Sequence, residues 1–121
     1  MATAGEVFAA MAEAVKGNGG KSIQRKLKGT VLFEITDINE KYALDLKSSE
    51  CSVTKGDGDM DKPDLIVMVN SENMAKLISG ELKPQQAFMK GKLKVKGKMG
   101  LAMKLTSVLV ATRSKMPKSK L

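Results

Sequence analysis

With 121 residues, 42% of them hydrophobic, the chain has the length and apolar content of one ordinary folded domain. It has no histidine and one cysteine, Cys51, which excludes histidine-based catalysis, histidine metal ligands, an intrachain disulfide and a cysteine-rich zinc site. The formal net charge of +8 is uneven, because residues 82–121 hold eleven basic residues and no acidic one. That distribution predicts an anionic membrane surface, nucleic acid or acidic protein as partner, unless the charge only keeps the surface soluble.

The first half of the sequence predicts one helix followed by four strands. Strong helix formers and an apolar face at a spacing of three and four residues predict a helix over residues 5–16, which the glycines of 17–20 end. Residues 22–28 fit either a short helical turn or a loop. The next apolar segments alternate or are apolar throughout and are separated by turn residues, which is typical of strands. We expect strands of an antiparallel meander at 30–36, 41–47, 51–54 and 64–69.

The second half of the sequence predicts three helices and one further strand. Asn70 or Ser71 can cap the first of these helices, and Gly80 can end it. Pro84 suits the first turn of the second helix. Strict alternation of Lys with apolar residues predicts the strand. We expect helices at 72–79, 84–90 and 101–109, and a strand at 92–96. Strands grouped between helices indicate an α+β fold in which helices are layered on one sheet.

Two features of the composition are candidates for function. Nine methionines, against three Phe, one Tyr and no Trp, suit a tolerant apolar pocket, although they also suit an ordinary core. Five alternate lysines would lie on one face of a continuous strand, where they could contact anionic lipid head groups or form a solvated face. These are Lys90, Lys92, Lys94, Lys96 and Lys98. Nucleic acid is the less favoured partner, because this face has no aromatic side chains for base stacking.

No motif of the sequence predicts catalysis or a metal site. Cys51 lacks a histidine to activate it, so we expect a structural or surface thiol. Residues 56–61 are acidic and glycine-rich, but they lack the glutamate that closes a calcium loop, so a plain turn is expected. The sequence therefore predicts a protein that is not an enzyme and that needs no metal.

The chain ends in Ser119, Lys120 and Leu121, the tripeptide that the peroxisomal import receptor reads at a free C-terminus. Basic residues precede it, and Pro117 disfavours a helix, so the tail is expected to be extended and accessible. The alternative is a frayed basic tail that carries no targeting signal. The tripeptide predicts a peroxisomal protein that binds the import receptor.

The stretch from Met99 to Leu105, M-G-L-A-M-K-L, together with residues 84–97, resembles the signature of the sterol carrier protein 2 family. The resemblance extends to the predicted strand at 64–69, the helix that follows it and the link G-E-L-K-P-Q-Q-A-F. It implies an α+β domain over residues 1–111, with a five-stranded, mostly antiparallel sheet covered on one face by helices. It implies an apolar tunnel between the two layers, and it leaves residues 112–121 as a flexible tail.

The resemblance also implies a small monomeric, non-enzymatic carrier without a cofactor. Such a carrier binds fatty acids, fatty acyl-CoA, phospholipids and sterols and moves them between membranes. The implied tunnel lining consists of Phe8, Met11, Val15, Phe33, Ile35, Ile66, Met68, Phe88, Leu101, Met103, Leu105 and Leu109. The alternative is a basic module that docks to peroxisomal membranes or acyl-CoA-using enzymes and has no ligand tunnel.

Overall fold

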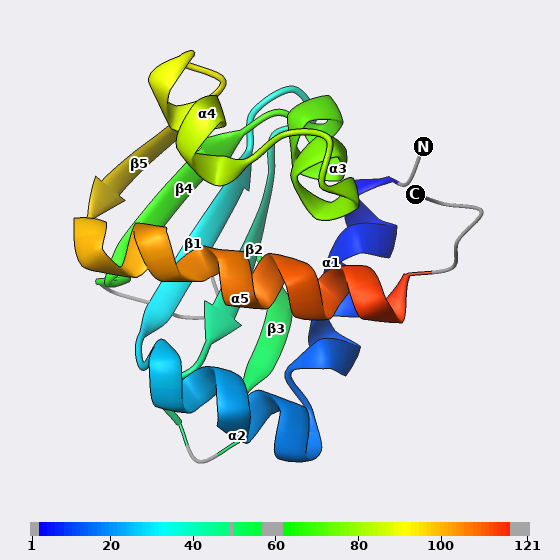
Figure 1. The fold of residues 1–121 in the computed structure, drawn as a ribbon, viewed down its shortest axis with the longest axis vertical. Helices are drawn as coiled ribbons and strands as arrows, with labels where there is room; N and C mark the ends of the chain where they lie inside the picture. Colours follow the sequence, from blue (N-terminus) through cyan, green and yellow to red (C-terminus); the bar gives the residue numbers. More distant parts are fainter. Residues whose placement is uncertain (1–2, 49, 57–61, 117–121) are drawn as a thin grey trace.

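The computed structural model describes residues 3–48, 50–56 and 62–116 and shows helices layered on one face of a five-stranded sheet (Figure 1). The helices are α1 (Ala4–Ala14), α2 (Gly17–Lys26), α3 (Ser71–Ser79), α4 (Pro84–Met89) and α5 (Met99–Lys115). The strands are β1 (Thr30–Ile35), β2 (Glu40–Asp45), β3 (Ser52–Lys55), β4 (Leu65–Val69) and β5 (Leu93–Gly97). The predicted α+β fold is therefore confirmed. Within the described ranges, no helix is both long and apolar enough to cross a membrane.

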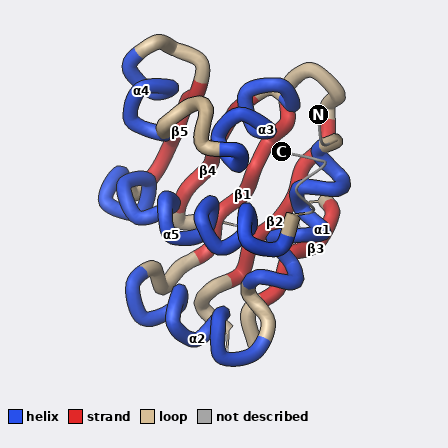
Figure 2. Tube along the Cα trace, turned by 45° about the vertical axis from the view of Figure 1, so that its right-hand side comes forward, coloured by secondary structure: helices blue, strands red, loops and turns tan. Residues whose placement is uncertain are grey.

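The sheet has the strand order β3-β2-β1-β4-β5, and its strands lie behind the helices in Figure 2. Three neighbouring pairs are antiparallel, whereas β1 and β4 are parallel. The predicted meander is thus right for β1, β2 and β3 and wrong for β4. The longer connection after β3 brings β4 to the free edge of β1, and its apolar sequence suits a position between two other strands. The prediction of a mostly antiparallel sheet holds.

The core fills the space between the sheet and α1, α3 and α5. Phe8 of α1 stacks on the ring of Tyr42, with centroids 4.1 Å apart, and tilts against Phe33 at 5.2 Å. Together these three rings attach the first helix to the middle of the sheet. Met11 and Val15, further along the first helix and just past its end, are at most 1% exposed. This end of the molecule is therefore closely packed.

Helix α2 includes most of residues 22–28, where a short helical turn or a loop was expected. It begins at Gly17, within the glycine segment that was expected only to end α1. Gly17 has a φ of +63°, a conformation open mainly to glycine. A Cβ on Gly20 would lie 1.8 Å from the carbonyl oxygen of Val15, so only glycine permits this close approach. Helix α1 thus ends at Ala14, before the glycines that were expected to end it, and the glycines allow α2 to start directly after it.

The predicted ends of α3 are confirmed. The side chain of Asn70 accepts a hydrogen bond from Asn73 N at 2.7 Å, which satisfies one of the free donors of the first turn. Gly80 ends the helix with a φ of +90°, and its N–H donates to Lys76 O.

Helix α5 is longer than predicted and crosses the front of the sheet in Figure 1. It continues to Lys115, with Thr112 fully buried and donating its hydroxyl to Val108 O at 2.7 Å. Met116, directly after it, is also buried. The expected start of a flexible tail at residue 112 is therefore wrong, because this turn packs into the domain. The tripeptide predicted to be a targeting signal, Ser119, Lys120 and Leu121, lies outside the described residues.

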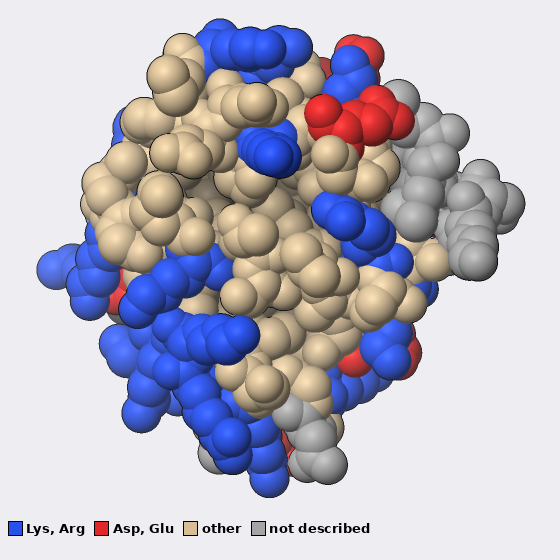
Figure 3. Space-filling view, viewed as in Figure 1, with Lys and Arg blue, Asp and Glu red and all other residues tan. Residues whose placement is uncertain are grey.

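Basic side chains gather on the helical side of the molecule over α2 and the first turns of α5 (Figure 3). Helix α2 exposes Lys21, Arg25 and Lys26, and α5 exposes Lys104. Acidic side chains are sparse in this view, and the surface between the basic groups is neutral. The helical face therefore presents a positive field to anionic surfaces.

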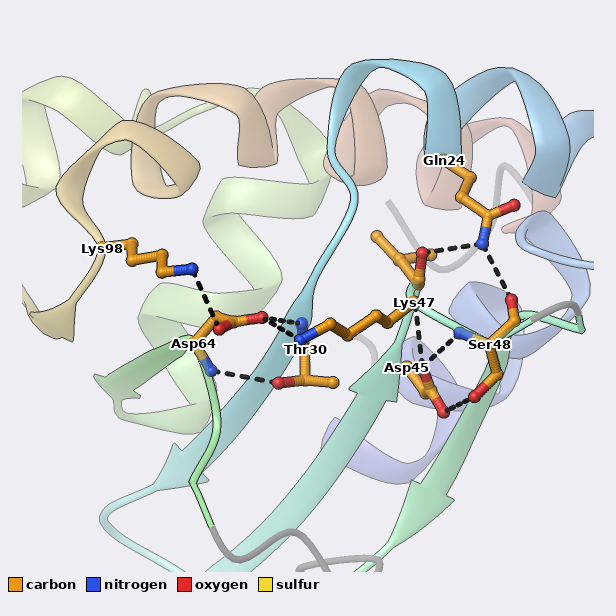
Figure 4. Close-up of polar contacts among 8 residues, drawn as sticks. Gln24, Thr30, Asp45, Lys47, Ser48, Asp64 and Lys98 are labelled. Carbon is orange, nitrogen blue, oxygen red and sulfur yellow. Dashed lines mark hydrogen bonds and ion pairs between the residues drawn. The ribbon is translucent and has the colours of Figure 1, made fainter.

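Asp64 holds together the starts of β1, β4 and α5 (Figure 4). Its carboxylate accepts a hydrogen bond from Thr30 N at 3.1 Å, and its own N–H donates to Thr30 Oγ1 at 3.0 Å. Lys98 Nζ lies 3.3 Å from the same carboxylate, and Lys47 Nζ lies 4.0 Å from it. Gly97 lets the chain turn into α5 here, because a Cβ at that position would lie 2.4 Å from Asp64 O. This junction places the first turn of α5 against the sheet.

A second junction attaches α2 to the end of β2. Gln24 Nε2 donates to the carbonyl oxygens of Leu46 and Ser48, both at 2.8 Å (Figure 4). Asp45 shapes this segment by accepting hydrogen bonds from the N–H groups of Lys47 and Ser48. The short basic helix is therefore fixed to the sheet.

Candidate functional site

A cavity of about 500 Å³ lies between α4, β5, α5 and the end of α3. Figure 3 shows the surface hollowed between α4 and α5, where most of the exposed atoms carry no charge. The α3–α4 side contributes Leu77, Leu82 and Phe88, and β5 contributes Leu93 and Val95. These side chains make the wall opposite α5 apolar.

Helix α5 forms the long wall of the cavity. Its cavity-facing residues recur at a spacing of three and four, which keeps them on one face of the helix. They include Met99, Ala102, Met103, Thr106, Val110 and Arg113. At 1.5 Å per residue, the stretch from Met99 to Arg113 is about 21 Å long. The cavity is therefore elongated along the helix, a shape that suits an extended apolar chain.

Few polar groups reach this cavity. Thr106 and Gln85 are its neutral polar side chains, and Lys83 and Arg113 are its charged ones. No carboxylate is among the described residues that line it. An apolar cavity with a few polar groups is typical of small-molecule sites, in which the polar groups orient the ligand.

Four of the twelve residues proposed for the tunnel line the cavity. Phe88 is 49% exposed and Met103 is 66% exposed, so both lie at its rim. Leu105 and Leu109 are buried and form its inner wall. The structure brings these four side chains together from α4 and α5.

Six other residues proposed for the tunnel pack elsewhere on the helical side. Leu101 packs on the backbone of Gly29, where a Cβ would lie 3.1 Å from its Cδ1 atom. The remaining five are buried in the core beside α1 and do not line the cavity. They are Phe8, Met11, Val15, Phe33 and Ile35.

Ile66 and Met68 do not face the helices, which corrects the expected orientation of β4. Their register partners are Lys96 and Lys94, both exposed. The alternate residue Val67 is buried in the core and pairs with Val95, which lines the cavity. Because side chains alternate across a strand, Ile66 and Met68 lie on the face away from the helices.

The five alternate lysines do not lie on one strand face, because two glycines interrupt the alternation. Gly91 has a φ of +72° and Gly97 a φ of +109°, so the chain turns on both sides of β5. Only Lys94 and Lys96 belong to the strand. The other three, Lys90, Lys92 and Lys98, are exposed in the flanking turns. Lys98 is also paired with Asp64.

Arg113 lines the cavity but was not predicted to do so, because the last helix was expected to end at residue 109. Continuing the spacing of Met99, Ala102 and Thr106 would have placed Arg113 on the same face. Arg113 Nε donates to Ile78 O at 2.5 Å, at the end of α3. The guanidinium group lies over Gly80, where a Cβ would approach it to 2.9 Å. Its position therefore depends on the glycine that ends α3.

Cys51 behaves as the sequence predicts. Its side chain is half-buried, with Sγ 3.9 Å from Gly20 O. Burial, together with the charge of Asp45, raises the pKa of the thiol above its ordinary value. The neutral thiol is thus favoured, which does not suit a nucleophile.

Large apolar side chains are exposed around the cavity. Phe88 and Met89 project from α4, and Met99, Met103 and Val110 project from α5. Met89 is the most exposed of them, at 79%. Exposed apolar groups concentrated at one opening are typical of an interaction surface.

The chain is similar to parts of larger proteins. It is 36% identical over 112 residues to hydroxysteroid dehydrogenase-like protein 2 of Xenopus laevis, covering 92% of this chain and 26% of that protein. It is 35% identical over 99 residues to peroxisomal multifunctional enzyme A of Dictyostelium discoideum, covering 80% of this chain and 22% of the relative. The chain thus spans about a quarter of the length of these relatives.

Solved structures share the fold over almost the whole chain. The sterol carrier protein domain 2 of Helicoverpa armigera has a TM-score of 0.69 and 31% identity, over 93% of this chain and 92% of that one. The palmitated SCP2L2 of Aedes aegypti has a TM-score of 0.67 and 27% identity, over 90% of this chain and 96% of that one. The model of the SCP-2 sterol transfer family matches residues 8–110. The chain therefore belongs to the SCP-2 sterol transfer family, as the motif in residues 84–105 predicts.

Proposed function

We propose that the protein binds one lipid molecule at a time in the cavity along α5 and carries it between membranes. The observation that carries this proposal is the elongated apolar cavity. Its volume of about 500 Å³ lies within the roughly 300–1,000 Å³ that is usual for small-molecule sites. Membership of the SCP-2 sterol transfer family supports it, as does the relative solved in its palmitated form.

The proposed ligands are fatty acids, fatty acyl-CoA, phospholipids and sterols, held without catalysis. Burial of each methylene contributes about 0.8 kcal/mol, so an acyl chain needs few polar contacts. One methylene more or less changes affinity little, which favours broad chain-length specificity. A non-catalytic role is also favoured by the lack of histidine and by the raised pKa of the Cys51 thiol.

We place the carrier in the peroxisome as a monomer that the import receptor recognises. The Dictyostelium relative is named as a peroxisomal enzyme, which supports this location. The C-terminal tripeptide, predicted to be a peroxisomal targeting signal, also supports it. Contact with an anionic membrane is proposed at the cavity rim, where apolar and basic side chains are exposed together. The cavity favours this carrier over a docking module without a ligand.

A cavity-filling variant tests the proposal. Ala102 lines the cavity from α5, so Ala102→Phe would fill part of the space that the ligand occupies. We expect affinity for a fluorescent fatty acid to fall roughly tenfold or more, because excluding two methylenes costs about 0.8 kcal/mol each. The measurement is fluorescence titration, with displacement by unlabelled lipids.

Ala9→Phe is the matched control, because Ala9 is an exposed alanine of α1 that does not line the cavity. This variant should bind the probe as the wild type does. Equal binding by all three proteins would mean that the ligand sits elsewhere. No binding by the wild type at micromolar concentration would refute the carrier itself.

A further inference from the structure

The charged side chains that line the cavity are all positive. They are those of Lys83 and Arg113, and no acidic residue described in the structure lines the cavity. Arg113 lies in the last turn of α5, while the other end of this helix contributes Met99 and Ala102. A ligand aligned with α5 would therefore have one end beside a cation and the other among apolar groups.

Arg113 is held in place without being neutralised. Its Nε donates to Ile78 O, and the missing side chain of Gly80 makes room for the guanidinium group. Among residues 3–48, 50–56 and 62–116, no carboxylate forms an ion pair with it. A guanidinium has five N–H donors in a planar fork, and this backbone contact uses one of them. The remaining donors can form two parallel hydrogen bonds to a carboxylate.

We infer that Arg113 is the head-group site of the cavity and that it binds the carboxylate of an unesterified fatty acid. The acyl chain extends from there along α5 towards Met99. The inference rests on the proposed lipid-binding function and deepens it, because it assigns the ligand's orientation and its preferred chemical class. Neutral lipids of the same length would bind through the apolar wall alone.

The test compares dodecanoate with dodecanol, which have chains of equal length and differ in charge. We expect the wild type to bind dodecanoate roughly ten- to hundredfold more tightly, the effect of hydrogen bonds to a charged group. Arg113→Gln should remove this preference, so that the ratio of the dodecanoate and dodecanol affinities falls towards one. Arg113→Lys should keep part of it, because an ammonium retains the charge but not the planar fork. Isothermal titration calorimetry measures all the affinities.

Lys115→Gln is the matched control, since it removes an exposed cation in the same turn that does not line the cavity. It should keep the full preference for dodecanoate. A preference that survives in Arg113→Gln, or that is absent from the wild type although dodecanol binds, overturns the inference and leaves the carrier function standing. Failure of both ligands to bind the wild type overturns the carrier function as well.

Arg113 also caps the end of α3, so its substitution can affect folding as well as binding. A measurement on the wild type alone avoids this problem. The Nε–H resonance of Arg113 should shift in NMR spectra on addition of dodecanoate and shift much less with dodecanol. The same shift with both ligands would contradict a carboxylate site at this residue.

Discussion

Asp64 shows how a single carboxylate fixes the geometry on which the cavity depends. The hydrogen bond from Thr30 N–H lowers the pKa of Asp64 most, and Lys98 and Lys47 add to the lowering. A carboxyl whose pKa is lower in the folded state stabilises the fold above its unfolded pKa of about 3.9. That contribution is lost as pH falls through the lower, folded pKa.

Asp64→Asn is therefore expected to lower the free energy of unfolding near neutral pH by about 1–2 kcal/mol, mainly through lost interactions with charge. The difference from the wild type should shrink as pH falls from about 4 towards the lower, folded pKa of Asp64, below which the folded wild-type carboxyl is protonated as well. Urea denaturation across this pH range measures both effects. Glu13→Gln is the control, because the side chain of Glu13 forms an exposed ion pair with Lys16. A constant difference at every pH would contradict the role given to the charge.

The residues of the candidate site were predictable only where the element that carries them was predicted well. The family resemblance implied Phe88, Leu105 and Leu109 as lining residues, and helical spacing within residues 101–109 also places Leu105 and Leu109 on one face. Ile66 and Met68 were misassigned because β4 is apolar at every position, so its sequence does not show which face is buried. Which face of such a strand is buried depends on its neighbours in the sheet rather than on its own sequence.

At the level of elements, the boundaries of helices and strands that are hardest to predict from the sequence are those at glycines. The same residue type ends α3 at Gly80, opens α2 at Gly17 and interrupts the lysine alternation at Gly91. From sequence, each of these glycines predicts a break in regular structure. Only the caps of α3 carried enough further information, through Asn70, to predict the local conformation. The position of a second helix directly after α1 depends on a tertiary contact that no local pattern encodes.

Two glycine-to-alanine substitutions test this account with opposite expected signs. Gly20→Ala places a Cβ against the carbonyl oxygen of Val15, so it should destabilise the fold by roughly 1–3 kcal/mol. Gly100→Ala adds a Cβ within α5 that would meet no atom of another element within 4 Å in the described part of the chain. It should stabilise the fold by up to about 1 kcal/mol, because alanine favours the helix. Thermal and urea denaturation measure both, and equal effects of the two changes would show that the close approach is unimportant.

On the scale of the whole molecule, the cavity, its apolar rim and the positive field occupy one side. The helices cover a single face of the sheet, so the cavity mouth and the basic α2 lie on the same helical side (Figures 1 and 3). A lysine near an anionic bilayer contributes about 1 kcal/mol, and a set of them orients the approach. Exposed methionines and Phe88 at the rim could then enter the lipid interface. This arrangement predicts that the proposed carrier loads and unloads with the cavity mouth against the membrane.

The prediction is tested with Met89→Glu, which places a charge on the most exposed apolar residue of the rim. Transfer of a fluorescent fatty acid between vesicles containing anionic lipid should slow severalfold, because a carboxylate is repelled by the surface and opposes insertion. Binding in solution should not change, since Met89 does not line the cavity. Ala9→Glu adds the same charge at an exposed site on α1 and should leave transfer close to the wild-type rate. Equal slowing by both variants would show that net charge acts rather than the rim.

Salt separates the electrostatic part of this docking from the apolar part. The Debye length falls from about 10 Å at 0.1 M to about 3 Å at 1 M ionic strength, so attraction between exposed lysines and lipid phosphates is screened. Wild-type transfer from anionic vesicles should therefore slow with added salt, whereas transfer from neutral vesicles should change little. The Met89→Glu defect should persist on neutral vesicles, because inserting a charge into the lipid interface is unfavourable at any ionic strength. Salt-independent transfer from anionic vesicles would mean that the basic side of the molecule does not meet the membrane.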